Sequence, residues 1–169
     1  TTTLGTGQIL KEAAEKGFNR VIVGLGGSAT NDAGVGMATA LGVRFLDSRG
    51  NALPPGGAAL VSLDRLDTSG LLPRLTGMEI IAATDVTNPL CGPTGASAIF
   101  GPQKGASKDV VAELDAALLN FAQVVKRDTG YDVLDIPGGG AAGGLGAGLI
   151  AFAGAKIQSG IDMVCEVLD

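Results

Sequence analysis

Residues 20–41, RVIVGLGGSATNDAGVGMATAL, indicate a strand, a glycine-rich loop and a helix in direct succession. The β-branched apolar run at 20–25 is typical of a strand that is buried on both faces. Residues 34–41 have the composition of a helix. Junctions of this kind often hold phosphate in α/β proteins, so the loop at 24–34 is the first candidate for a binding site.

The rest of the chain continues the alternation of strands and helices. It predicts a helix over 8–16, strands over 43–47 and 79–86, and a long helix over 107–127. The apolar stripe of the long helix consists of Val110, Val111, Leu114, Leu118, Phe121 and Val125. We therefore predict a single domain over residues 1–169, with a three-layer α/β fold, a parallel or mixed sheet and glycine-rich strand–helix loops.

Composition excludes several classes of function. Twelve basic and 17 acidic residues give a net charge of −5, and no basic cluster favours a nucleic-acid partner. Histidine is absent, which excludes a histidine-dependent triad and leaves Asp, Glu, Lys, Cys or Tyr131 for proton transfer. A divalent ion would take oxygen ligands, as Mg²⁺ does. Cys91 and Cys165 are expected to be buried thiols of a cytoplasmic protein without a signal peptide.

A mean hydropathy of +0.35 raises the question of a membrane span at 136–155, a stretch without charges. Most of its apolar residues are glycine and alanine, and each glycine lowers helix propensity. We instead expect a glycine-rich loop that leads into a tightly packed helix, and no membrane partner.

Three glycine-rich segments, at 24–36, 84–105 and 137–148, are candidates for one common site. Glycine lets backbone N–H groups approach an anion closely, and loops at one end of a parallel sheet converge. The residues predicted to bind phosphate or substrate are Gly26, Gly27, Ser28, Asn31, Asn88, Lys104, Gly138 and Gly139. Tight turns and close packing are the alternative explanation for any single glycine cluster.

Two aspartates are the candidate catalytic acids. Asp85 follows the strand at 79–86 and is predicted to be the general base or the acid that organises Mg²⁺. Asp32, in the first loop, is the second choice, and with Asn31 it is expected to face the substrate or the metal. An Asx turn is the structural alternative for Asp85 or Asn88, and a solvated side chain is the alternative for Lys104.

The first loop also fits the dinucleotide pattern G-x-G-x-x-G/A, with Asp47 near the position of a ribose-binding acid. That pattern requires a helix to begin at the glycines, whereas SATND intervenes at 28–32. An NAD(P)-binding oxidoreductase domain therefore remains the alternative enzyme, and a non-catalytic ligand-binding domain is the other alternative.

Three long motifs resemble the bacterial type I glycerate kinase family. They are GLGGSATNDAGVGMATALGVRFLD at 24–47, ATDVTNPLCGPTGASAIFGPQKGAS at 83–107 and PGGGAAGGLGAGLIAF at 137–152. The similarity covers nearly the whole chain and includes GNALPPGGAAL at 50–60.

This resemblance implies ATP-dependent phosphorylation of D-glycerate with Mg²⁺, for which Asp85 is the predicted metal-organising residue. Enzymes of this family have longer chains with two α/β domains, one inserted in the other, and this chain resembles the inserted domain. The resemblance thus implies that the rest of a parent kinase is a partner and that the fragment alone is inactive. It leaves undecided whether the protein forms a homodimer.

Overall fold

A computed structural model describes residues 1–168 of the chain, and the side chains of residues 1–165. Its main sheet consists of β1 (Arg20–Gly24), β4 (Glu79–Ala83) and β5 (Lys156–Gln158), in the order β1-β4-β5 with all strands parallel. A separate antiparallel ribbon pairs β2 (Arg44–Leu46) with β3 (Arg65–Asp67). The predicted α/β class with a parallel sheet is confirmed.

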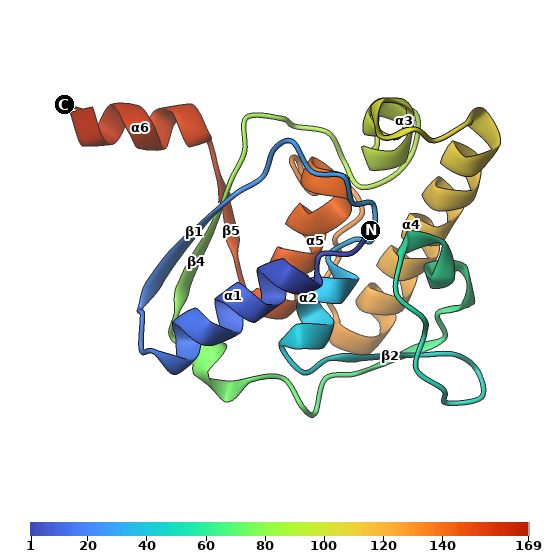
Figure 1. The fold of residues 1–169 in the computed structure, drawn as a ribbon, viewed down its shortest axis with the longest axis horizontal. Coiled ribbons are helices and arrows are strands. Elements are labelled where there is room, and N and C mark those ends of the chain that lie inside the picture. Colours follow the sequence, from blue (N-terminus) through green and yellow to red (C-terminus); the bar gives the residue numbers. More distant parts are fainter. Residues whose placement is uncertain (169) are drawn as a thin grey trace.

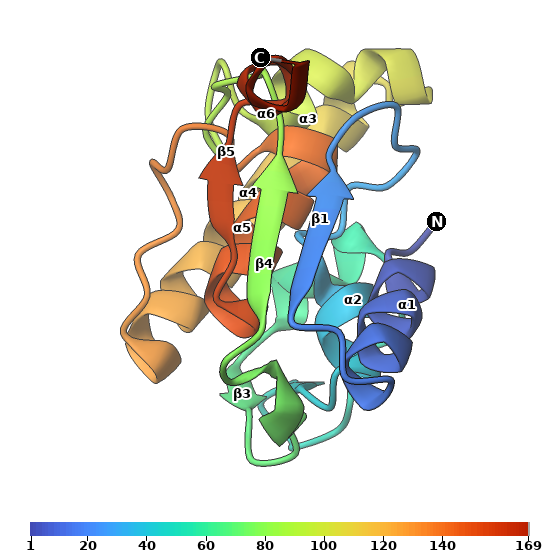
Figure 2. The same cartoon turned by 90° about the vertical axis from the view of Figure 1, so that its left-hand side faces the viewer.

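The sheet forms one outer layer of the molecule. Helices α1 (Leu4–Glu15), α2 (Val35–Ala40) and α5 (Ala141–Ala153) form the next layer, and α4 (Lys108–Thr129) with β2 and β3 lies beyond them (Figure 1). The view onto the sheet shows β4 between β1 and β5, with the helices behind (Figure 2). The sheet is therefore not the central layer of a helix–sheet–helix sandwich.

The two faces of the sheet differ in burial. Side chains on the inner face pack against the core, and these are Val21, Val23, Ile80, Ala82 and Ile157. On the outer face Ile22 pairs with Ile81 and is 54% exposed. β1 is thus buried on one face only, whereas a strand buried on both faces was predicted.

The remaining elements are two helices and three short 3₁₀ turns. They are α3 (Ala96–Phe100), α6 (Gly160–Leu168) and 3₁₀ turns at Gly57–Ser62, Pro73–Leu75 and Pro102–Lys104. The helix predicted at 8–16 begins earlier, at Leu4. Gly7 lets this helix pack closely against α2, because a Cβ there would lie 2.2 Å from the Met37 carbonyl oxygen.

Helix α4 follows the signals in its sequence. The Ser107 hydroxyl accepts a hydrogen bond from Val110 N at 3.3 Å, and Gly130 ends the helix with a φ of 80°. The buried part of the apolar stripe runs from Ala117 to Val125. The first two turns are an exception to the predicted stripe, because Val110 is 41% exposed and Leu114 is only half-buried.

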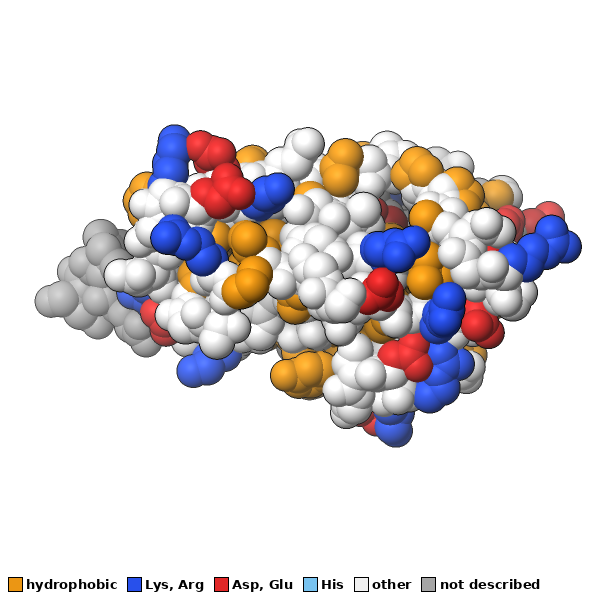
Figure 3. Space-filling model, turned by 90° about the horizontal axis from the view of Figure 1, so that it is seen from below, with side chains coloured by type: hydrophobic (Ala, Val, Ile, Leu, Met, Phe, Trp, Pro, Cys, Tyr) orange, Lys and Arg blue, Asp and Glu red, His pale blue; other side chains and the backbone are white. Residues whose placement is uncertain are grey.

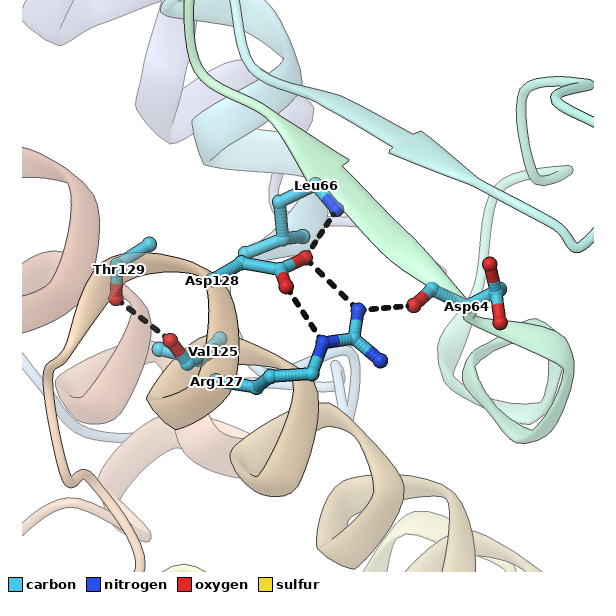
Figure 4. Close-up of polar contacts among 6 residues, drawn as sticks. All are labelled: Asp64, Leu66, Val125, Arg127, Asp128 and Thr129. Carbon is cyan, nitrogen blue, oxygen red and sulfur yellow. Dashed lines mark hydrogen bonds and ion pairs between the residues drawn. The ribbon is translucent and has the colours of Figure 1, made fainter.

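Polar contacts tie the end of α4 to β3 (Figure 4). Asp128 accepts a hydrogen bond from the backbone N–H of Leu66 at 2.8 Å, and Arg127 Nε donates to Asp128 at 2.6 Å. The Arg127 guanidinium also donates to the carbonyl oxygen of Asp64. Arg127 lowers the pKa of the Asp128 carboxyl, so the carboxylate stays ionised at this junction.

The glycines at 143–148 allow close packing against the first loop. A Cβ at Gly143 would lie 1.9 Å from the carbonyl oxygen of Thr30, and one at Gly148 would lie 2.3 Å from that of Ala33. Ala142, Gly143 and Gly144 adopt left-handed backbone angles at the start of α5. The predicted glycine-rich loop leading into a buried helix is therefore confirmed.

The surface carries charges of both signs. On the face at the amino ends of the main strands, Lys and Arg side chains lie beside Asp and Glu (Figure 3). Ion pairs such as Arg20–Glu79 and Arg44–Asp67 account for part of this mixture. No helix within residues 1–168 is both long and apolar enough to cross a membrane.

Candidate active site

The loop after β1 presents a run of backbone N–H groups without acceptors. Leu25 is the last residue before the loop whose N–H makes a hydrogen bond, and it donates to the Ala83 carbonyl at 2.8 Å. Within the described residues, the N–H groups of 26–31 make no hydrogen bond. The next helix, α2, begins only at Val35. The loop therefore keeps backbone donors available for a ligand, and it is longer than the tight turn of a dinucleotide fold.

Lys104 closes this loop from the opposite side. It lies at the end of the 3₁₀ turn after α3, and its Nζ donates to Ser28 Oγ at 3.1 Å and to the Thr30 carbonyl at 2.6 Å. Burial lowers the pKa of Lys104, and the negative charge of Asp32 partly offsets this effect. The structure thus joins two of the glycine-rich segments through a half-buried cation.

Two cavities meet at Lys104. The first, which we call the loop cavity, has a volume of about 140 Å³ and is lined by Gly26, Gly27, Ser28, Gln103 and Lys104, among others. The second, the Asn31 cavity, has a volume of about 330 Å³ and lies between Asn31, Lys104, residues 55–59 and Leu114. Four of the predicted binding residues, Gly26, Gly27, Ser28 and Asn31, therefore lie around a fifth, the cation Lys104.

Asn31 is held by α3. Its Nδ2 donates to the hydroxyl of Ser97 at 2.9 Å, and Ser97 is fully buried. The buried Oδ1 of Asn31 has no hydrogen-bond partner among the described residues. The Asn31 amide is thus fixed through Nδ2, while Oδ1 remains available to accept a hydrogen bond in a residue that lines the cavity.

Asp32 lies beneath the loop and lines neither cavity. The side chain is 1% exposed, and its oxygens accept hydrogen bonds from Thr3 N at 2.9 Å and Gly34 N at 3.2 Å. The prediction that Asp32 faces the substrate or a metal does not match this placement. The carboxylate instead turns inward, toward the N–H groups of Thr3, Gly34 and Gly36 that bind it.

Asp85 lies at the carboxyl end of the sheet, as predicted, and is exposed. Its Oδ1 accepts hydrogen bonds from Ser159 Oγ at 3.0 Å and from Ile161 N at 3.2 Å, at the start of α6. These bonds lower the pKa of Asp85 and keep it ionised at neutral pH. The adjacent residue, Val86, lines the loop cavity.

The other predicted binding residues have contacts typical of turns. Asn88 donates through Nδ2 to the Thr94 carbonyl at 2.8 Å, and its own carbonyl accepts from Gly140 N at 3.0 Å. Gly138 and Gly139 are buried, and the Gly139 N–H donates to Ile136. None of these three predicted residues lines the loop cavity or the Asn31 cavity, because each is committed to the turn before α5.

Two features of the site were not anticipated from the sequence. Residues 55–59 form a wall of the Asn31 cavity, and Gly57 lies so close that a Cβ would be 1.9 Å from the Asn31 carbonyl. The signal in the sequence was the Pro-Pro-Gly-Gly run at 54–57. Asp115 of α4 also holds the second glycine-rich segment, by accepting from Gly92 N at 3.0 Å.

The cysteines differ from the prediction. Cys91 is half-buried, and Cys165 is exposed because it lies on α6 at the edge of the molecule (Figure 1). Burial, with nearby Asp115 and Asp135, raises the pKa of Cys91 to about 12. This thiol therefore stays protonated at neutral pH and is a poor nucleophile.

The glycine-rich loop, the lysine that closes it and the α/β fold coincide with a match along the whole chain. The sequence profile of the glycerate kinase family matches residues 1–169. The chain belongs to the glycerate kinase family. Glycerate 2-kinase of Escherichia coli K12 is 52% identical over 169 residues, and glycerate kinase of Bacillus subtilis 168 is 48% identical over the same length.

Solved structures agree with this membership. A crystal structure of a Salmonella typhimurium LT2 protein that carries the name glycerate kinase 2 superposes with a TM-score of 0.96 at 50% identity. It covers 99% of this chain, which in turn covers 45% of that protein. The chain likewise spans 44% of the Escherichia coli and Bacillus subtilis relatives. This member of the glycerate kinase family thus spans slightly less than half the length of these relatives.

Proposed function

We propose that the protein containing this chain transfers the γ-phosphoryl group of ATP to D-glycerate, and that this chain forms one wall of the active site. Family membership and relatives named glycerate kinase support the reaction. The observation that carries the assignment to this site is the run of N–H groups at 26–31, beside Lys104, that have no acceptor in the part of the chain that the structure describes. Oriented amides and a cation together stabilise a phosphoryl group without covalent chemistry.

The two cavities suggest how this chain acts on its substrates. The amides of 26–28 would bind phosphate oxygens in the loop cavity, and the Lys104 ammonium would neutralise the charge that develops during transfer. Asn31 and residues 55–59 offer a separate polar and apolar surface on the other side of Lys104. Holding both reactants against one cation supplies proximity as well as charge stabilisation.

Asp85 is the residue of this chain that fits a role at Mg²⁺. No group of three or more potential metal-ligating side chains exists within the described residues. Mg²⁺ is usually held by one or two carboxylates together with substrate phosphates and water, so a single ionised Asp85 is compatible with it. Bound Mg²⁺ would neutralise phosphate charge. Because its pKa is lowered, Asp85 suits a metal-organising role better than that of a general base.

Replacing Asp85 with asparagine in the full-length protein is expected to lower kcat by about ten- to a hundredfold, because the ionised oxygen is lost. Added Mg²⁺ should restore part of this rate if Asp85 organises the metal. The measurement is coupled ADP release at increasing Mg²⁺ concentrations, and Asp162→Asn, an exposed acid on α6, serves as the control. A kcat loss that no Mg²⁺ concentration relieves would contradict the metal-organising role.

The organisation of the parent protein is part of the same proposal. The chain would be the inserted domain of a two-domain cytoplasmic kinase, whose remaining part supplies the second wall. The test measures ADP release and phosphoglycerate formation with ATP and D-glycerate, for the full-length protein and for residues 1–169 alone. Turnover is expected from the full-length protein only. Equal turnover by the fragment would contradict the shared active site, and absence of phosphoglycerate from both would contradict the activity.

The dinucleotide alternative has no comparable support. The helix that should begin at the glycines begins at Val35, nine residues after Gly26 in the numbering of the chain. Asp47, the candidate ribose-binding acid, instead accepts hydrogen bonds from Arg49 N and Asn51 N in its own turn.

A further inference from the structure

Asp32 is a buried charge that the proposed reaction does not use. Its side chain is 1% exposed, and among the described residues no Lys or Arg side chain forms an ion pair with it. A buried carboxylate is costly to retain unless its oxygens are well satisfied. Its hydrogen bonds therefore indicate what the charge does in this fold.

The carboxylate joins three segments of the chain. At the start of α1, Thr3 donates to Oδ2 through its N–H at 2.9 Å and its hydroxyl at 3.0 Å. At the end of the loop, Gly34 N donates to Oδ1 at 3.2 Å. In α2, Gly36 N donates to Oδ2 at 3.3 Å. The loop at 26–31 is thus anchored immediately beyond its last residue.

Thr3 extends this anchor into α2. Its hydroxyl donates to Asp32 and accepts a hydrogen bond from Met37 N at 2.9 Å. A valine at position 3 would keep the shape of the side chain and remove this bridge while leaving the charge of Asp32 in place. The chain therefore offers a substitution that separates the anchoring contacts from the charge.

The charge of Asp32 also acts on Lys104. Lys104 holds the same loop from its other side, through Ser28 Oγ and the Thr30 carbonyl. Burial lowers the pKa of Lys104, and among the charged groups of the described residues Asp32 is the one that raises it. The carboxylate beneath the loop and the ammonium above it are thus electrostatically linked.

We propose that Asp32 is a positioning residue: its buried carboxylate anchors the loop at 26–31 to α1 and α2, and its negative charge acts on Lys104, which holds the same loop through Ser28 and Thr30. This inference rests on the proposed function, because it assumes that Lys104 and the loop bind phosphate. It replaces a direct role of Asp32 at substrate or metal with an indirect one, exerted through the loop and through Lys104.

The test compares Asp32→Asn with Thr3→Val in the full-length protein. Asp32→Asn is expected to lower kcat/KM by about tenfold and to move the alkaline limb of the pH profile to lower pH. The direction follows because Lys104, without its partner charge, loses its proton at lower pH. Thr3→Val is expected to raise the KM for ATP about threefold and to leave the alkaline limb in place.

An alkaline limb that Asp32→Asn leaves unmoved would overturn the electrostatic part, and an unchanged KM for ATP in Thr3→Val would overturn the anchoring part. If Asp32→Asn does not fold, Asp32→Glu replaces it, because it keeps the charge and displaces the oxygens. For Asp32→Glu, an alkaline limb at the parent pH together with a raised KM for ATP supports the proposal. A displaced alkaline limb or an unchanged KM for ATP overturns it.

A direct titration separates this inference from the proposed function. The pKa of the Lys104 ammonium is measured by NMR in full-length protein with isotope-labelled lysine, with Lys104→Met used for assignment. A lower pKa in Asp32→Asn, or an unchanged one in Asp32→Glu, supports the link even if D-glycerate is not phosphorylated. A pKa that Asp32→Asn leaves unchanged overturns it, whatever the activity.

Discussion

Replacing Lys104 with methionine in the full-length protein is expected to lower kcat by about a hundred- to a thousandfold. Lys104 lies between the two cavities, and it is the cation that lines both of them. Methionine keeps most of the side-chain volume and removes the charge, so the change tests electrostatic stabilisation of the transferred phosphoryl group. The loss should appear mainly in kcat, because the charge on the phosphoryl oxygens grows toward the transition state.

Lys108→Met is the matched control, because Lys108 is an exposed lysine at the start of α4, four residues away. Coupled ADP release at saturating ATP and D-glycerate measures kcat for both variants. Lys108→Met should retain the parent rate. A Lys104→Met variant with parent kcat and parent KM values would place phosphoryl transfer away from this lysine.

The second large effect concerns the core. Phe121→Ala is expected to lower the free energy of unfolding by about 3–5 kcal/mol, because it leaves a cavity where an aromatic ring was fully buried. Phe121 is fully buried, with its ring centroid 6.5 Å from that of Phe45 and 6.2 Å from that of Phe152. Three rings from β2, α4 and α5 thus meet at one point, and the cavity would loosen all three elements.

Leu114→Ala is the control on the same helix. Leu114 belongs to the same apolar stripe, but it is half-buried and lines the Asn31 cavity, so we expect a loss of about 1 kcal/mol or less. Urea unfolding of the 169-residue chain, which has its own core and is expected to fold alone, measures both variants. Equal losses of unfolding free energy for the two variants would mean that Leu114, beside the Asn31 cavity, is packed as tightly as Phe121 in the core.

Local signals in the sequence determined the elements that depend on neighbours along the chain. Ser107 and Gly130 bound α4 because a cap involves contacts within one turn of the helix. The β-branched run at 20–24 and the apolar run at 79–83 are strands for a similarly local reason, whereas their parallel pairing is a long-range contact. Gly26, Gly27 and Ser28 were recognisable as a candidate binding loop because glycine and a following helix mark such loops in α/β proteins.

Only the tertiary structure decided which polar residues meet. Lys104 reaches Ser28 across 76 positions of the chain, and Asn31 reaches Ser97 across 66. Asp32 shows the reverse case: its place in a glycine-rich loop suggested an active-site acid, yet Thr3 and Gly36 bury it beneath that loop. Spacing in the sequence specifies what lies within a few residues, whereas burial and long-range contacts depend on how the helices pack. For that reason the sequence by itself determined several elements, among them α4, β1 and β4, and the candidate loop, and packing decided which of the two aspartates stayed exposed.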